Sequence, residues 1–296
     1  MISILSPERA DELTELADQA EAAAAAAAQR AGLQVELLHE LPDLQAAMEL
    51  LACVWGTEPD LPPVSRDLMR AFVHSGNYVA GALIAGEVVG ASVGFLGCHG
   101  QRVVLHSHIT GVSAAAQGHR VGFALKQHQR AWAMCRGLTE ITWTFDPLIR
   151  RNAYFNLTKL RAKIVAYEPA FYGPMGDRIN AGDETDRCVI LWSLTDPGVI
   201  AASSDHGSSP AAPDGLPAGD VVLAEDGDGR PVVRKSDAPV LVAQIPADIV
   251  AIRQTAPDLA IEWRHALRTT FRGALDSGYK AVRMSRSGWY TMERGQ

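Results

Sequence analysis

The sequence predicts an α/β protein with a central sheet flanked by helices, and three observations support this prediction. Segments in which apolar residues recur at helical spacing alternate with segments rich in β-branched and aromatic residues. Of the 296 residues, 47% are hydrophobic and 21% are charged, so the chain can bury a sizeable core. The length exceeds that of one minimal domain, so we expect an additional subdomain beside the main one.

An alanine-rich helix is predicted first, over residues 7–31. Ser6 can act as its N-cap and Gly32 can end it. Its apolar stripe is thin, because only alanines follow Leu16 on that side. We therefore expect residues 1–32 to form a separate N-terminal helix, which packs weakly, packs against a partner chain or is an exposed appendage.

Residues 33–196 have the pattern of a compact core of strands and helices. A strand near Val35 precedes two helices, and the turn at 85–87 predicts a β-hairpin. Gly137 ends the longest helix of this region. The predicted strands cover residues 78–84, 88–96, 102–112, 140–145, 164–167 and 188–194, and the later helices cover residues 121–135 and 152–160.

The last hundred residues begin with a stretch dense in Pro, Gly and Ser, which predicts a linker over residues 197–219. Residues 220–296 then predict a C-terminal α/β extension with a hairpin, two helices and a final strand. The segment 226–229 (Asp-Gly-Asp-Gly) hints at a calcium loop, but the glutamate expected at loop position 12 is missing. A hairpin turn is therefore the favoured interpretation there.

Composition excludes several classes of protein. The four cysteines lie far apart with no C-x-x-C pair, so a zinc finger or a disulfide framework is not expected. The net charge of −7 argues against broad nucleic-acid binding. No apolar run approaches 18 residues, and acidic residues near the start argue against a secretory signal. We expect a cytoplasmic protein with no nucleic-acid or membrane partner.

The most informative segment joins the strand over residues 102–112 to the helix that begins at Val121. It contains glycines at 118 and 122, where the backbone can approach a ligand closely. The free N–H groups and the positive dipole end of a helix N-terminus attract anions. Residues 117–163 also hold nine Lys or Arg against two acidic residues, which favours a polyanion such as a phosphorylated cofactor.

The sequence resembles the GNAT superfamily of CoA-dependent N-acyltransferases over about residues 35–195, a range that includes this segment. The pyrophosphate motif Q/R-x-x-G-x-G/A falls on residues 117–122, where Gln117 and Gly122 match and Arg120 replaces the first glycine. Residues 144–160 resemble a subgroup in which T-F-D-P-L leads into an N-x-x-x-N-x-x-K-L helix and a C-terminal extension follows. The resemblance implies a GNAT-type mixed, mostly antiparallel central sheet.

The resemblance also implies that acyl-CoA, most simply acetyl-CoA, is the co-substrate and that no metal is needed. Acyl-CoA would lie in a V-shaped gap between the strands over residues 102–112 and 140–145, with its pantetheine paired like an added strand. The cofactor-binding residues implied are Thr110, Gly111, Val112, Gln117, Gly118, His119, Arg120, Val121, Gly122 and Asn152.

Three side chains are candidates for removing a proton from the attacking amine. His106 and His108 alternate along a strand and so share one face, and histidine can act as a base near neutral pH. Asp146 is the other candidate, as a base or as a clamp on a cationic substrate. The alternative is that each histidine is a structural residue. GNAT enzymes often use a tyrosine as the general acid that protonates the departing thiolate. In this sequence that position holds Leu157, so Tyr154, Tyr172 or water is left for the role.

The predicted function is acyl transfer from acyl-CoA to a small-molecule amine by direct attack. Alternatives are an amino-acid N-succinyltransferase, for which Arg150 and Arg151 could bind the extra carboxylate, and a non-catalytic acyl-CoA sensor. A metal enzyme is a further rival, because the two strand histidines together with His99 or His119 could bind zinc. The C-terminal extension could cover the acceptor site or mediate dimerisation, so a homodimer is an open expectation.

Overall fold

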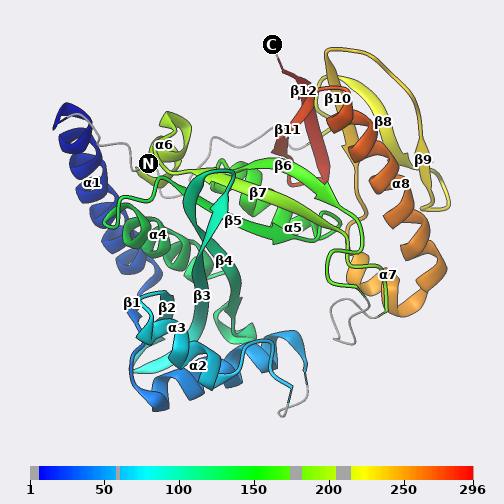
Figure 1. Ribbon diagram of the computed structural model, residues 1–296. Helices are drawn as coiled ribbons and strands as arrows, with labels where there is room; N and C mark the ends of the chain where they lie inside the picture. Colours follow the sequence, from blue (N-terminus) through cyan, green and yellow to red (C-terminus); the bar gives the residue numbers. More distant parts are fainter. Residues whose placement is uncertain (1–6, 58–60, 174–181, 205–214, 296) are drawn as a thin grey trace. The chain divides into compact units, whose positions relative to one another are not determined.

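The chain folds into two compact units, shown in a computed structural model (Figure 1). The first unit combines residues 1–142 with 193–206, and the second combines residues 143–192 with 207–296. The boundary falls within strand β5 (Glu140–Phe145). The residues that the structure describes are 7–57, 61–173, 182–204 and 215–295.

The first unit contains a sheet in the order β1-β2-β3-β4-β5. The first four strands pair antiparallel, and β4 pairs parallel to β5, so the predicted mostly antiparallel sheet is confirmed. Ala85 and Gly86 join β2 to β3 with φ angles of 51° and 83°, as a tight hairpin turn requires. The strands are β1 (Gln34–Leu37), β2 (Tyr78–Ile84), β3 (Glu87–His99) and β4 (Arg102–Val112).

Helices cover both faces of this sheet. A Cβ at Gly90 would meet Val121 and Leu125 of α4 (Val121–Met134), which therefore covers one face. The neighbouring Ala91 points to the other face, into a core shared with α2 (Leu41–Trp55) and α3 (Arg66–His74). The buried side chains of that core are Leu38, Leu44, Ala47, Leu51, Val64, Met69, Val79, Ala91, Val93 and Ile109.

The N-terminal helix α1 (Pro7–Ala31) packs along α4 (Figure 1). Its alanine stripe is buried in this contact, with Ala20 fully inaccessible to solvent. Small side chains let two helix backbones approach closely, so a thin apolar stripe is enough for tight packing. The expectation of a weakly packed or exposed helix is therefore wrong. The other buried alanines are Ala17, Ala24 and Ala27.

The second unit holds the end of β5, followed in the sheet by β7 (Arg187–Ser193) and β6 (Lys163–Glu168). The C-terminal residues form another sheet, in the order β11-β12-β10-β8-β9. Thr158 ties the two parts together, because its hydroxyl donates to the backbone oxygen of Met284 at 2.6 Å. The remaining elements are α5 (Arg150–Ala153), a π-helical turn (Tyr154–Lys159), β8 (Asp220–Glu225), β9 (Pro231–Val233), β10 (Val240–Gln244), α7 (Ile249–Thr255), α8 (Pro257–Asp276), β11 (Tyr279–Met284) and β12 (Trp289–Arg294).

Local structure differs from the sequence prediction at two places. The predicted linker over residues 197–219 begins with helix α6 (Pro197–Ser204), which Asp196 stabilises by accepting a hydrogen bond from the N–H of Gly198. Strand β12 was not predicted; it lies between β11 and β10 and completes the C-terminal sheet. Asp226 forms the predicted hairpin turn, because its carboxylate accepts from the N–H groups of Asp228 and Arg230.

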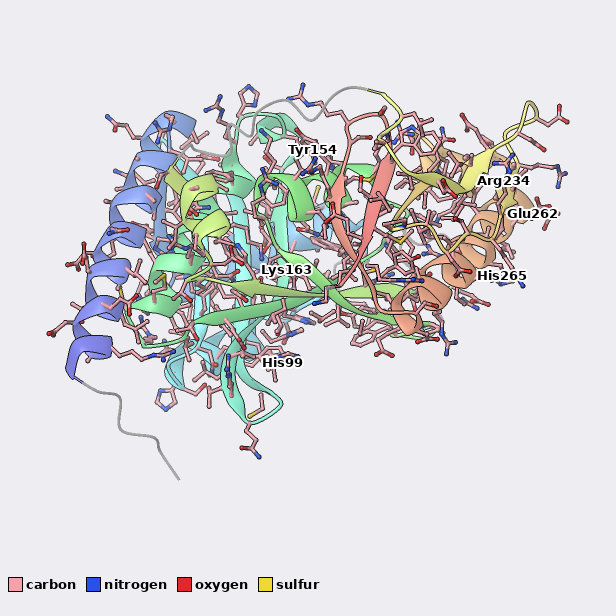
Figure 2. All side chains as sticks on the ribbon, turned by 90° about the horizontal axis from the view of Figure 1, so that it is seen from above. His99, Tyr154, Lys163, Arg234, Glu262 and His265 are labelled. Carbon is pink, nitrogen blue, oxygen red and sulfur yellow. The ribbon has the colours of Figure 1, made fainter. Side chains whose placement is uncertain are left out.

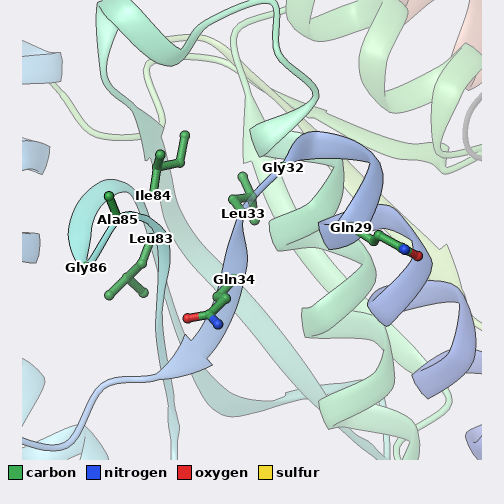
Figure 3. A pocket seen from close by; sticks show the side chains of 8 residues that line it. All are labelled: Gln29, Gly32, Leu33, Gln34, Leu83, Ile84, Ala85 and Gly86. Carbon is green, nitrogen blue, oxygen red and sulfur yellow. The ribbon is translucent and has the colours of Figure 1, made fainter.

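A shallow hollow of about 430 Å³ opens in the first unit, where the end of α1 and β1 face the β2–β3 turn (Figure 3). None of its lining residues carries a titratable side chain, so it supplies no acid, base or nucleophile. The hollow is lined by Gln29, Gly32, Leu33, Gln34, Leu83, Ile84, Ala85 and Gly86.

No helix of the described residues combines the length and the apolar sequence that a membrane span requires.

Candidate active site

An irregularity in β4 positions the two histidines. Val93 of β3 pairs with Ile109, and the next residue, Gly94, pairs with Ser107, so β4 contains one extra residue at His108. Such a bulge bends the strand and changes which way the following side chains point. The imidazole centroids of His106 and His108 lie 6.5 Å apart on one side of the strand. The two histidines therefore lie together, as the sequence predicts, but on a bent strand.

Aromatic and hydroxyl groups surround His106. Its ring centroid is 5.1 Å from that of Phe95, and Phe95 stacks on Phe72 of α3 at 5.6 Å. The His106 Nδ1 atom lies 3.1 Å from the hydroxyl of Thr142 on β5, which fixes the direction of the ring. Thr142 was not singled out in the sequence, and only the pairing of β4 with β5 identifies it.

Both imidazoles are held in the neutral form. Burial lowers the pKa of His106 to about 4, and the nearby charges of His108 and Lys126 act in the same direction. Burial also lowers the pKa of His108. The expected basicity near neutral pH is thus wrong for His106. At neutral pH its ring is unprotonated and can accept a proton, although as a weak base.

The turn from β4 into α4 contains a short 3-10 helix (Ala114–Ala116) and then the predicted phosphate motif. Gln117 closes the turn, because its side-chain amide donates to the backbone oxygen of Val112 at 3.3 Å. His119 Nδ1 lies 3.1 Å from the Gln117 backbone oxygen. The N–H groups of Phe123 and Ala124 donate to the Arg120 oxygen, whereas no backbone oxygen of the described residues accepts from Val121 or Gly122.

Arg120 adopts a backbone conformation that favours glycine. It is the N-cap of α4 with a φ of 64°, in the left-handed region. This explains why a glycine suits that position of the motif, and the arginine tolerates the same conformation at a cost of about 1–2 kcal/mol. Gly118 also has a positive φ, of 85°, so the turn uses two left-handed residues.

Gly122 has no steric reason to be glycine within this chain. A Cβ placed there would meet only Val112 at 3.9 Å, an ordinary contact. Its backbone lies in the first turn of α4, where the N–H groups point outward along the helix axis. The open space over Gly122 therefore leaves room for a group that contacts the bare backbone.

Residues 110–112 form the end of β4, with which the pantetheine of CoA was predicted to pair. Gly111 is required by packing, because a Cβ there would come within 2.9 Å of Leu51 and 3.0 Å of Trp55. The Thr110 hydroxyl lies 2.8 Å from that of Ser92 on β3. One edge of β4 pairs with β3 as far as Val112. On its other edge β5 pairs with Leu105 and His106, and beyond His106 no strand of the described part of the first unit pairs with that edge. The proposed pairing of pantetheine with residues 110–112 stays a prediction.

Asp146 lies in the second unit, inside a buried network of charges. Arg264 donates to both of its carboxylate oxygens, at 2.9 and 3.0 Å, and Arg253 donates to Oδ2 at 2.6 Å. Both arginines also donate to Asp183, at 2.8 and 2.9 Å. Burial alone would raise the pKa of Asp146, but the charges of Arg264, Arg253 and Arg187 outweigh it and hold the pKa well below its ordinary value.

This arrangement corrects the prediction that Asp146 is a base or a substrate clamp. A carboxylate that is 7% exposed, with both oxygens occupied by arginines, is neither basic nor open to a cationic substrate. Its partners come from α7 and α8, which no local motif identifies. Asn152 belongs to α5 of the same unit, and its predicted contact with the cofactor stays a prediction.

The basic residues of the segment 117–163 are distributed over the two units. Lys126 and Arg130 are buried in α4, and the Arg136 guanidinium lies 4.1 Å from the centre of the Trp132 ring. The prediction that this basic segment binds a polyanion such as a phosphorylated cofactor stays a prediction.

The candidates for the acid also lie in the second unit. Leu157 is fully buried, and as a leucine it has no proton to donate. Tyr154 (labelled in Figure 2) accepts a hydrogen bond from Arg286 at 3.2 Å, and the Lys159 ammonium lies 6.0 Å from its ring centre. Tyr172 lies 3.2 Å from the hydroxyl of Thr144.

A metal site would need more ligands than the histidine pair supplies. Among the residues described, no group of three or more His, Cys, Asp or Glu side chains is arranged to bind a metal ion.

Buried neutral histidines predict a pH-dependent stability. In the unfolded chain histidine has a pKa near 6.5, whereas burial lowers it to about 4 for His106 and for His128, whose Nδ1 lies 2.9 Å from the Tyr78 hydroxyl. Below about pH 6.5 the unfolded state therefore binds more protons than the folded state, and the free energy of unfolding falls until about pH 4. Urea unfolding at several pH values checks this; a free energy of unfolding that stays constant over this range would contradict it.

Comparisons with known proteins give structural similarity alone. No protein-family model matches the chain, and no curated protein matches its sequence. The solved structures that it resembles include yncA of Salmonella typhimurium, a putative acetyltransferase with its cofactor acetyl-CoA (16% identity, TM-score 0.46), covering 56% of this chain and 95% of the other. A GNAT-family acetyltransferase of Streptococcus pneumoniae (15%, 0.43) and aminoglycoside 6'-acetyltransferase type Ii (18%, 0.43) each cover 54% of this chain and 97% of the other.

Proposed function

We propose that this protein transfers an acyl group, most simply acetyl, from acyl-CoA to the amine of a small molecule. One observation carries the proposal: β4 holds a neutral histidine pair and leads through a short turn into a helix N-terminus with an open glycine at Gly122. An anionic diphosphate would bind the N–H groups of Val121 and Gly122, aided by the helix dipole and by the Arg120 charge.

In the proposed reaction the amine attacks the thioester carbonyl directly. The protein then has to hold both reactants, remove a proton and stabilise the oxyanion. His106 is the proposed base, because its ring is neutral at neutral pH and Thr142 fixes its orientation at 3.1 Å. His108 lies beside it, and Phe95 forms an apolar wall.

The test combines binding and turnover. Calorimetric titration of CoA into the protein should give measurable heat, and acetyl-CoA with a panel of small amines should release free CoA thiol. No binding at millimolar CoA would overturn the proposal. Parallel assays with succinyl-CoA and amino acids separate the acetyl donor from the succinyl alternative.

Replacing Gly122 by valine should weaken CoA binding by at least about tenfold, because the side chain would fill the space over the first helical turn. Calorimetry measures this. The matched control is Gly273→Val in α8, another helical glycine with open space around its Cβ. Equal CoA affinity in the Gly122 and Gly273 variants would contradict the placement of the phosphate site.

A non-catalytic acyl-CoA sensor is the second candidate. Two departures from the pattern of catalytic GNAT enzymes favour it. Arg120 stands at a glycine position of the phosphate motif, and the buried Leu157 stands where those enzymes often carry a tyrosine as general acid. Measurable CoA binding without thiol release for any amine would select the sensor over the enzyme.

A further inference from the structure

A buried lysine lies behind the histidine pair. Lys126, in the middle of α4, is 5% exposed, and its ammonium donates to the hydroxyl of Ser107 at 2.8 Å and to the amide oxygen of Gln129 at 3.1 Å. Gln129 in turn lies 3.4 Å from the hydroxyl of Ser92. The lysine is thus built into a polar network between α4 and the sheet.

Ser107 connects this network to the candidate base. It stands between His106 and His108 at the bulge of β4, and its side chain points toward α4 while the imidazoles point to the other face. The Lys126 ammonium therefore holds Ser107, the residue just before the extra residue His108 of the bulge. The ammonium and the imidazoles are separated by a single layer of backbone.

The other charges around His106 are few and partly paired. His108 lies beside it on β4. Burial is the main cause that lowers the pKa of His106, and the electrostatic interactions with His108 and Lys126 lower it further. At the other end of the same strands, Arg102 donates to Glu140 of β5 at 2.7 Å, and His99 of β3 lies 3.9 Å from the second oxygen of that carboxylate. On α4, His128 and Arg130 are engaged with Tyr78 and with the Leu194 oxygen.

We propose that Lys126 is a positioning residue of this site: through its hydrogen bond to Ser107 it holds the segment of β4 that carries the histidine pair, and its ammonium acts on the His106 imidazole across the strand. The inference rests on the proposed role of His106 as the base. Burial lowers the pKa of Lys126 to about 7, so its charge changes near neutral pH and is available to influence the imidazole on the other side of the strand.

The test follows the His106 imidazole by NMR during a pH titration of the full chain without substrate. In Lys126→Met the positive charge is lost while an unbranched side chain remains, so the pKa of His106 should rise by about one unit. In Ser107→Ala the bond is lost but the charge remains, so the pKa of His106 should rise much less than in Lys126→Met. Arg136→Met, which removes an exposed cation just after α4, is the control and should leave that pKa unchanged.

The wild-type protein supplies a second readout that does not depend on the folding of a variant. The His106 signals should show a second, smaller inflection near pH 7, when Lys126 loses its proton. The absence of this inflection, or an unchanged His106 pKa in a folded Lys126→Met protein, would overturn the inference. Because no turnover is measured, failure of the proposed acyl transfer and failure of this inference are distinguishable.

Discussion

Replacing Arg264 by methionine is expected to lower the free energy of unfolding by about 3–5 kcal/mol. The Arg264 side chain is fully buried and donates to both Asp146 and Asp183. Methionine would fill much of the volume but would leave the two buried carboxylates with Arg253 alone. Loss of one partner from a buried ion network costs far more than the network gains over apolar packing, because the remaining charge is left uncompensated.

Urea denaturation measures this effect, and the same unit supplies a matched control. Arg230 and Glu262 form an ion pair at 2.6 Å whose side chains are 60% and 42% exposed; Glu262 is labelled on α8 in Figure 2. Arg230→Met should cost less than about 1 kcal/mol, because an exposed pair gains little over hydrated charges. Equal losses in the two variants would show that the buried network has no special role.

Replacing His106 by alanine should lower turnover by about 10²–10⁴-fold if this residue removes the amine proton. The rate of the wild-type enzyme should fall as the pH drops through about 4, because the active form is the neutral imidazole. This acid inflection should disappear in His106→Ala.

The control for this prediction is His74→Ala. His74 is an exposed histidine at the end of α3 in the same unit, so its removal should leave the turnover unchanged. An unaltered pH–rate profile in His106→Ala would remove His106 from the role of base, whatever the size of the rate loss.

Local patterns predicted much of the first unit. The glycine turn at 85–87 predicted the β2–β3 hairpin, and the motif at 117–122 lies on a strand–turn–helix connection as expected. The alternation of residues along β4 also predicted that the two histidines lie on one side of the strand. In the structure they do so, but at a bulge formed by the extra residue His108. A one-residue register shift leaves no local sequence signal, because it depends on pairing with β3.

Long-range pairing explains the errors. Asp146 looked like a site residue because it stands at the end of a strand, yet its partners come from two distant helices. The burial of Lys126 was not predicted, since a lysine on a predicted helix is normally exposed. The alanine stripe of α1 offers little apolar area, so the sequence predicted weak packing. The stripe is nevertheless buried, because α4 packs closely against it. Each error concerns a contact between elements far apart in the chain.

The separation between Asp146 and its arginines bears on how the chain folds while it is being synthesised. Arg253 and Arg264 follow Asp146 by 107 and 118 residues, so the aspartate leaves the ribosome long before either guanidinium exists. Domains generally fold as units during translation. The buried charge network of the second unit therefore cannot form until α7 and α8 have been synthesised, so this unit completes its folding late relative to the synthesis of β5.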